Sequence, residues 1–281
     1  MKKISTYLLT GLISCMLVGC ASEAAPNSST ENRVFKIGLA QIVEHTSLNT
    51  IRESMLSELA VLGYKEGENI EVDVKNAQGE ASTLNSIMQT FVGDKKDLLV
   101  AIATPTAAAA APYAETIPVI FSAVSDPVGA GLISDPNQPD KNITGTSDEI
   151  QVAQILDLAL TINPNLKTLG YIYNASEANS VSNLQKVKAY CEDKNITLIE
   201  TTIASVAEIQ QSAQVLASKV DAIFAPNDNT IASSIDALNM AALQANCPVY
   251  VGADSMVQGG GFASVGINYE DLGKATAKMI A

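Results

Sequence analysis

Residues 118–147, PVIFSAVSDPVGAGLISDPNQPDKNITGTS, are the stretch from which the fold class can be predicted. They begin with a short apolar run, 119–121, of the kind that forms a buried parallel strand. Small and turn-forming residues follow where that strand should end, and a second short strand is expected at 143–146. In open α/β sheets, ligands bind beyond the carboxyl ends of the strands. We therefore expect this stretch to supply part of a ligand site and the first crossing between two lobes.

An alternation of apolar strands and amphipathic helices runs from Phe35 to the end of the chain, in two successive series. Because parallel strands need helical crossovers, each series predicts a doubly wound sheet. The predicted fold class is α/β, with two Rossmann-like lobes joined by a hinge. Lobe 1 is expected at 34–147, lobe 2 at 148–267, and a return to lobe 1 at 268–281. The strands are expected at 35–40, 70–74, 98–103, 119–121, 143–146, 168–173, 196–202, 222–225, 249–252 and 263–267.

The composition is that of an acidic globular protein. The 281 residues include 17 basic and 30 acidic side chains, which give a formal net charge of −13 at pH 7. A surface of this sign repels phosphate backbones, so we expect no nucleic-acid partner. The hydrophobic content of 47% argues against disorder.

The amino terminus has the form of an export signal. A basic start, Met1-Lys2-Lys3, precedes a mostly apolar segment, 4–18, that is too short to span a membrane. The ending Leu17-Val18-Gly19-Cys20 resembles a bacterial lipobox, which implies that Cys20 is lipid-modified. We expect a signal peptide at 1–20 and a flexible tether at 21–33, and hence an exported protein anchored to the outer face of the membrane. An ordinary signal peptide with an incidental cysteine is the alternative.

Hydrogen-bonding side chains stand at the predicted strand ends, where the two lobes should face one cleft. Thr104, Thr106 and Ser122 are suited to hold a ligand carboxylate, and Glu44 and Asp254 could pair with an ammonium group. The alternative for each polar residue is a helix N-cap with no ligand role. The candidate ligand-binding residues are Gln41, Glu44, His45, Thr104, Thr106, Ser122, Ala123, Tyr173, Asn174, Asn227, Asp254 and Asn268.

Two of these candidates carry rings. His45 is the one histidine of the chain, so it makes a poor metal site, and it is read either as a rim residue or as a ligand contact. Tyr173 is a plausible cleft wall, whereas Tyr171 on the same strand face is expected in the core.

Motifs of catalysis and cofactor binding are missing from the sequence. There is no G-x-S-x-G, no P-loop, no H-E-x-x-H and no G-x-G-x-x-G after a strand. We therefore expect no enzyme, no metal and no cofactor. Cys191 and Cys247 form no CxxC motif; both are expected in the core, and a disulfide between them remains open.

The motifs after Arg33 resemble the lipoprotein substrate-binding subunits of ABC importers with the type I periplasmic-binding-protein fold, in the branch of tryptophan- and tyrosine-binding proteins. Within that fold, Asn227, Asp254 and Asn268 match positions that contact the ligand. Similar proteins continue for a few dozen residues, so the chain is expected to be truncated after Ala281. The matching segments are KIGLAQIVEH at 36–45, ATPTA at 103–107, FSAVSDPVGAGL at 121–132, NITGTS at 142–147, GYIYNASEANS at 170–180, DAIFAPNDN at 221–229 and PVYVGADSMVQGGGFASVGINYEDLG at 248–273.

The resemblance implies that the protein binds a small ligand between its lobes and delivers it to an ABC permease in the membrane. The ligand is expected to be tryptophan, tyrosine, phenylalanine or another apolar amino acid, because the rim offers polar groups but few fixed charges. Two alternatives stay open. One is a sensory module for a membrane receptor, and the other is an exported hydrolase.

Overall fold

The computed structural model describes residues 33–138 and 141–281. The expected signal peptide, Cys20 and most of the expected tether lie outside these residues. Residues 34–281 form one compact unit, which contains two parallel sheets.

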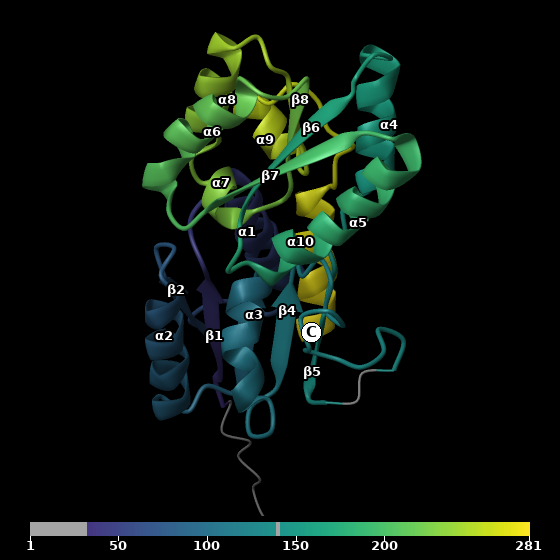
Figure 1. The fold of residues 1–281 in the computed structure, drawn as a ribbon. Coiled ribbons are helices and arrows are strands. Elements are labelled where there is room, and N and C mark those ends of the chain that lie inside the picture. Colours follow the sequence, from purple (N-terminus) through teal and green to yellow (C-terminus); the bar gives the residue numbers. More distant parts are fainter. Residues whose placement is uncertain (1–32, 139–140) are drawn as a thin grey trace, which may run out of the picture. The chain divides into compact units, whose positions relative to one another are not determined.

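The first sheet has five parallel strands in the order β2-β1-β3-β4-β5. Helices α2 and α3 pack together on one side of this sheet, and α1 and α10 pack together on the other (Figure 1). The strands are β1 (Phe35–Gln41), β2 (Ile70–Asn76), β3 (Leu98–Ile102), β4 (Val119–Ser122) and β5 (Ile143–Gly145). The helices are α1 (Thr46–Val61), α2 (Ala81–Gly93), α3 (Thr104–Ala110) and α10 (Tyr269–Ile280), and a 3-10 turn follows α3 at Ala111–Tyr113. We call this group the first half.

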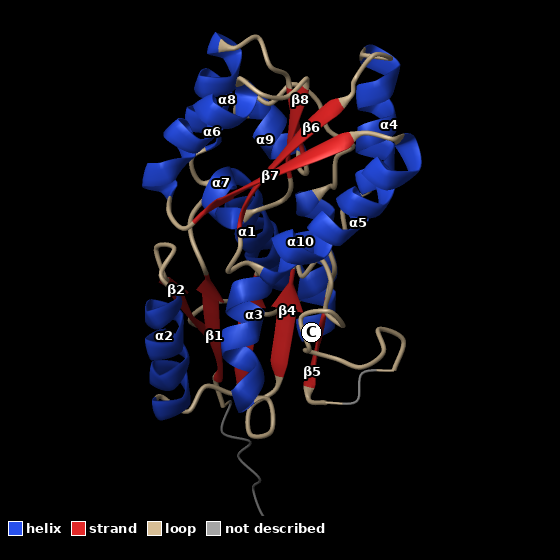
Figure 2. Ribbon diagram, in the orientation of Figure 1, coloured by secondary structure: helices blue, strands red, loops and turns tan. Residues whose placement is uncertain are grey.

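The second sheet has four parallel strands in the order β7-β6-β8-β9. Helix α4 packs on α5, and α6 packs on α8, as in a doubly wound sheet (Figure 2). The strands are β6 (Thr168–Asn174), β7 (Thr197–Ile203), β8 (Ala222–Ala225) and β9 (Val249–Val251). The helices are α4 (Val152–Ile162), α5 (Ala178–Lys194), α6 (Ile209–Ala217), α7 (Asn229–Ala232), α8 (Ile235–Gln244) and α9 (Asp254–Gln258), with a 3-10 turn at Val206–Glu208. We call this group the second half.

The predicted α/β class is confirmed, and one predicted strand is wrong. Residues 263–267 were expected to form a strand, but they form a single bridge, from Ala263 to Tyr250. The glycine-rich segment 259–261 turns the chain just before it, and Asn268 caps α10 just after it. The chain therefore leaves the edge of the second sheet here to cross back to the first half.

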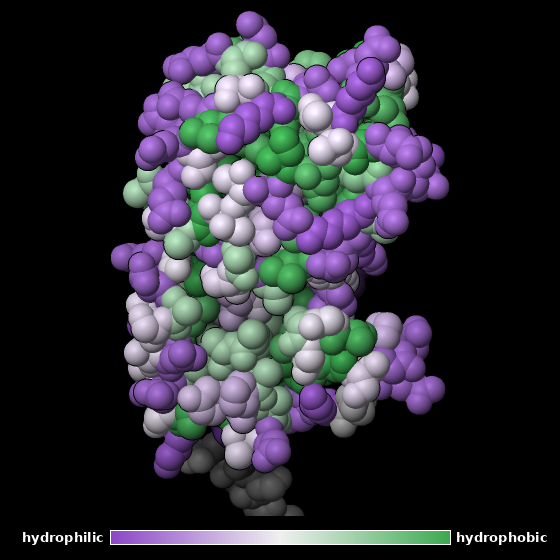
Figure 3. All heavy atoms as spheres, viewed as in Figure 1, coloured by the Kyte–Doolittle hydropathy of each residue, from purple (hydrophilic) through white to green (hydrophobic). Residues whose placement is uncertain are grey.

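Apolar residues from both faces of each sheet make up the core. Tyr171 is fully buried, as predicted, and its hydroxyl donates to the Ser180 carbonyl oxygen at 2.7 Å. Cys191 and Cys247 are buried free thiols. The space-filling view shows hydrophilic side chains over much of the visible surface, with hydrophobic patches between them (Figure 3).

Three hydroxyl groups bind α10 to the first sheet; those of Ser122 and Thr276 are buried and that of Thr146 is half-buried. The Ser122 Oγ lies 2.8 Å from Thr276 Oγ1, Thr276 Oγ1 lies 2.9 Å from Thr146 Oγ1, and Thr146 Oγ1 lies 3.2 Å from Ser122 Oγ. Ser122 ends β4, Thr146 follows β5, and Thr276 lies in α10. This hydroxyl ring therefore joins both segments by which the chain leaves and re-enters the first half.

Helix α10 also approaches α1 closely at Gly273. A Cβ atom added there would lie 2.5 Å from the Ile51 carbonyl oxygen, which is closer than atoms can pack. Gly93, at the end of α2, has no atom within 4 Å of the same position.

We expect Gly273→Ala to lower the free energy of unfolding by about 1–3 kcal/mol, because the new methyl group forces α10 away from α1. The matched change Gly93→Ala should raise it by about 0.5–1 kcal/mol, because alanine suits a helix better than glycine. Urea unfolding of both variants measures the two effects. An unchanged stability in Gly273→Ala would contradict the close approach of the helices.

Candidate functional site

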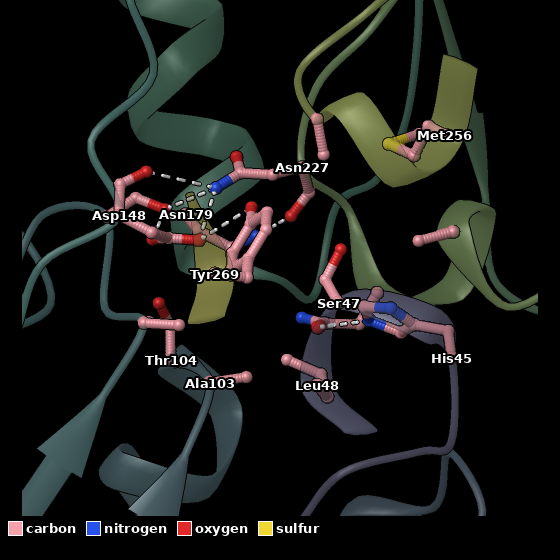
Figure 4. Close-up of a pocket in the computed structure, with 15 residues that line it drawn as sticks. His45, Ser47, Leu48, Ala103, Thr104, Asp148, Asn179, Asn227, Met256 and Tyr269 are labelled. Atoms are coloured by element: carbon pink, nitrogen blue, oxygen red, sulfur yellow. Dashed lines mark hydrogen bonds between the residues drawn. The ribbon is translucent and has the colours of Figure 1, made fainter. Parts of the chain in front are cut away.

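A small pocket lies where segments of the two halves meet, and Figure 4 shows it in close-up. Its volume is about 10 Å³, roughly the space that one water molecule needs. Several of its walls follow strand ends of the two sheets, as expected for parallel sheets. The lining residues are His45, Ser47, Leu48, Ala103, Thr104, Ala123, Ser125, Asp148, Asn179, Asn227, Asn229, Ala232, Ala253, Met256 and Tyr269.

A buried carboxylate, Asp148, lies at one end of the pocket (Figure 4). It accepts hydrogen bonds from Ser125 Oγ at 2.7 Å and from Asn227 Nδ2 at 2.8 Å, and a longer one from the Tyr269 hydroxyl at 3.4 Å. Ser125 belongs to the first half, Asn227 follows β8 in the second half, and Tyr269 begins α10. One side chain therefore connects segments from both halves.

No lysine or arginine is among the described residues that line the pocket, so Asp148 has no cation beside it there. Burial raises the pKa of Asp148 to about 6, against the opposing effect of the hydrogen bonds from Ser125 and Asn227. Burial also lowers the pKa of His45, the one basic side chain in the lining, so this ring is neutral at pH 7. The pocket thus presents a negative group without a positive one, and an ammonium group would complement it.

Two further carboxylates hold the wall of the second half in place. Glu177 is buried and accepts hydrogen bonds from the backbone N–H and side chains of Asn229 and Thr230. Asp228 caps α7 and accepts from Asn174 N, Ser180 Oγ and Ile231 N. Burial, together with the nearby charge of Glu177, raises the pKa of Asp228. Both carboxylates are hydrogen-bonded to these donors and so stabilise this wall of the pocket.

Direct contacts join the halves at the other end of the pocket. His45 Nε2 lies 3.3 Å from Asn229 Oδ1, and the hydroxyls of Ser47 and Ser255 form a short hydrogen bond. His45 and Ser47 stand at the start of α1, while Asn229 and Ser255 lie in helices of the second half.

The floor of the pocket carries backbone strain. Ala103 has a φ of 77° and Ala123 a φ of 57°, and both line the pocket at the ends of β3 and β4. Ala103 pairs this φ with a ψ of 157°, a combination that suits glycine and costs an alanine free energy. Beside it, Thr104 Oγ1 is buried without a hydrogen-bond partner, as is Asn179 Oδ1 across the pocket. Strained backbone and unpaired polar atoms are typical of ligand sites.

The structure brings four of the predicted site residues into this lining, His45, Thr104, Ala123 and Asn227. Three other predicted residues are engaged elsewhere in the first half. Gln41 is buried, donates to Asn49 Oδ1 and accepts from Arg52. Glu44 is exposed and lies 3.6 Å from Arg52. Ser122 is part of the hydroxyl ring and does not line the pocket.

The remaining predicted residues also have other positions. Thr106 is buried inside α3, outside the lining. Tyr173 packs against Tyr171 with ring centroids 5.1 Å apart, and Asn174 Nδ2 donates to Thr230 Oγ1. Asp254 is exposed at the start of α9 and accepts from Ser255 N.

Asn268 caps α10 by accepting from Asp271 N, which is the helix-cap role that was the alternative for such residues.

The sequence-based candidates did not include Asp148, Tyr269, Asn179 and Asn229, which all line the pocket. Asp148 and Tyr269 belong to the segments that cross between the halves, so a search of strand ends passes over them. Asn229 lies two residues after Asn227 and could have been found by the same rule. Asn179 lies in α5, and no sequence signal marks it.

The described residues contain neither a candidate metal site nor a candidate membrane-spanning helix. No cluster of three or more His, Cys, Asp or Glu side chains is placed to hold a metal ion in this part of the chain. Among the described helices, none combines the length and the hydropathy that a membrane span requires.

A two-sheet α/β chain with a polar pocket between its halves has the architecture of a ligand-binding protein. The family model for ABC transporter substrate binding proteins matches residues 36–281. The chain therefore belongs to the ABC transporter substrate-binding protein family. The predicted type I periplasmic-binding-protein fold is confirmed. Membership of a substrate-binding family also confirms the expectation that the chain is not an enzyme.

Three of the similar proteins are described by their identity and coverage. A tyrosine-binding protein of Clostridioides difficile is 37% identical over 285 residues, which cover 99% of this chain and 83% of that protein. The ABC domain from Streptococcus pneumoniae in complex with L-Trp is 39% identical, with a TM-score of 0.85 over 88% of this chain and 83% of that chain. A substrate-binding protein from Clostridium difficile in its ligand-free, open structure is 39% identical, with a TM-score of 0.64 over 88% and 84% of the two chains.

The last two comparisons differ in TM-score, 0.85 against 0.64, at the same identity of 39%. Divergence in sequence therefore does not account for the difference. The described conformation is closer to the structure that holds L-Trp than to the open one, which agrees with the small volume of the pocket.

We expect Ala103→Gly to raise the free energy of unfolding by about 1 kcal/mol, because relief of a strain of about 1–3 kcal/mol exceeds the usual cost of a new glycine, about 0.4–1 kcal/mol. Ala101→Gly, in the interior of β3, is the matched control and should be destabilising by about 1 kcal/mol. Thermal or urea unfolding measures both. A loss of stability in Ala103→Gly as large as in Ala101→Gly would argue against strain.

Proposed function

We propose that this protein is the extracytoplasmic substrate-binding component of an ABC importer and that it binds an aromatic amino acid in the pocket between its halves. The observation that carries the proposal is Asp148, a buried carboxylate that lines the pocket with no cation among the lining residues. A ligand with an ammonium group supplies the missing positive charge.

The polar groups of the pocket suit the two ends of an amino acid. The ammonium group would pair with Asp148 and replace the long contact from Tyr269. The carboxylate would accept a hydrogen bond from Thr104 Oγ1, which is buried and has no partner in the described protein. Because leaving such a hydroxyl unpaired costs free energy, binding a carboxylate there is favourable.

The aromatic side chain is inferred from the relatives. The tyrosine-binding protein and the complex with L-Trp share 37% and 39% identity with this chain. Tyrosine, tryptophan and phenylalanine are therefore the first ligands to test.

The pocket has to open for such a ligand to enter, since its volume of about 10 Å³ is far below that of an aromatic ring. We infer a hinge motion of the two halves about the segments that cross between them. In the cell, the protein would be exported, held at the membrane by a lipid on Cys20, and would deliver its ligand to a permease in the same membrane.

Calorimetric titration of the chain from Ser22 tests the proposal. We expect tyrosine, tryptophan or phenylalanine to bind, and the analogue of the same ligand that lacks the ammonium group to bind about a hundredfold more weakly or not at all. The absence of binding by all three amino acids to a cooperatively folded sample would refute the proposed ligand class.

The pH dependence of affinity provides a prediction specific to Asp148. In the described conformation, with no ligand in the pocket, its pKa is about 6, above the usual value of 3.8, so it gains a proton as the pH falls through 6. Binding an ammonium group requires that this proton leave. The dissociation constant should therefore be steady from pH 7 upward until the ligand's own amino group begins to lose its proton, and it should rise by up to about tenfold per pH unit below 6.

One variant of Asp148 and two control variants separate this carboxylate from other titrating groups. Asp148→Asn should weaken binding and lose this pH dependence. Asp254→Asn, at the exposed start of α9, should keep both the wild-type affinity and its pH dependence. His45→Gln should retain the slope as well, because burial lowers the pKa of His45. An unchanged slope in Asp148→Asn would rule out the ammonium pairing, and circular dichroism checks that each variant is folded.

A further inference from the structure

A second cavity lies beside the pocket, and nothing so far assigns it a role. It has a volume of about 120 Å³ and is bounded by both halves. Ile42 and Val43 line it from the segment after β1, while Val206, Asn229 and Thr230 line it from the second half. We propose that the aromatic ring of the bound amino acid occupies this cavity while its ammonium and carboxylate groups occupy the pocket. The inference rests on the proposed function and deepens it.

The two spaces share one wall, the side chain of Asn229. Glu177 holds the amide and the backbone N–H of this residue, so Asn229 is fixed. On the opposite side stands His45, whose ring contacts Asn229 at 3.3 Å, a long distance for a hydrogen bond. His45 lines the pocket but not the second cavity, and the proposal requires that its ring and Asn229 separate so that the two spaces join.

The size of the second cavity suits one aromatic ring. A cavity of about 150 Å³ lined by apolar side chains in another protein holds benzene, and 120 Å³ is close to this volume. The pocket around Asp148, at about 10 Å³, has room only for small polar groups, and even these require some opening. Because both spaces lie between the halves, the same hinge motion widens both.

The walls of the cavity combine apolar side chains with uncharged polar ones, among them Gln78 and Ser205, and so favour an uncharged group. Thr230 Oγ1 already donates to Glu177, and Ser233 Oγ donates to the Thr230 carbonyl oxygen. With these hydroxyls engaged, Ile42, Val43 and Val206 leave apolar surface facing the space. Glu80, at the exposed rim, is the one charged residue in the lining. An acidic side chain would meet no positive charge here, so we expect aspartate and glutamate to be rejected.

A tryptophan placed at Val206 tests the assignment, because it would fill the cavity from its rim. Val206 is 49% exposed, so the change should not disturb folding. Val215, in α6, is 50% exposed, does not line the cavity, and provides a matched control. We expect Val206→Trp to weaken binding of tyrosine, tryptophan and phenylalanine by about tenfold or more, and Val215→Trp to leave it unchanged.

The outcomes distinguish this inference from the proposed function. If the wild type binds an aromatic amino acid and Val206→Trp binds it within about twofold, the ring lies elsewhere and the inference is refuted while the proposed function stands. If the wild type binds no aromatic amino acid, both fail together. A second variant, Val206→Ala, should enlarge the cavity and shift selectivity toward tryptophan over phenylalanine. If Val206→Ala kept the wild-type ratio of affinities for tryptophan and phenylalanine, that result would also count against the inference.

Discussion

The buried carboxylate of Asp148 is the interaction around which the two halves are arranged. A charge in the interior is costly unless donors or cations surround it. Here the donors come from three separate segments, Ser125, Asn227 and Tyr269, and each segment belongs to a different part of the chain. Satisfying this one group therefore requires the halves to approach in a particular way. The same requirement leaves the carboxylate at the edge of the pocket, where the ammonium group of the proposed ligand would replace the weakest of its donors, Tyr269.

The rest of the second half supports this arrangement through further buried polar groups. Glu177 and Asp228 bind the start of α7 and thereby fix Asn229. Cores that contain fully satisfied polar networks are specific in their geometry, because any displacement leaves a group unpaired. By contrast, the contacts of His45 and Ser47 across the halves involve single hydrogen bonds. The second-half wall of the site is thus held by many hydrogen bonds, while His45 and Ser47 each contact it through one.

The sequence predicted the sheet architecture well, because each strand and each helix follows from a local pattern of apolar residues. It missed the end of the second sheet, where 263–267 have strand composition but only Ala263 pairs with β9 before the chain crosses back to the first half. For the site, the rule that ligands bind at strand ends found Thr104, Ala123 and Asn227. It could not show that Ser122 bonds Thr276, a partner 154 residues away. Nor could it find Asp148, because burial, which makes this carboxylate distinctive, depends on the packing of both halves.

The ring of hydroxyls at Ser122, Thr146 and Thr276 has a mechanical consequence. Thr146 lies where the chain leaves the first half, and Thr276 lies in the helix with which it returns, yet both are bonded to the end of β4. The two connecting segments are thus both hydrogen-bonded to the end of β4, which forms a common base for them. In the proposed hinge motion, this base would therefore move with the first half, and the bending would fall on the chain between the ring and the second half.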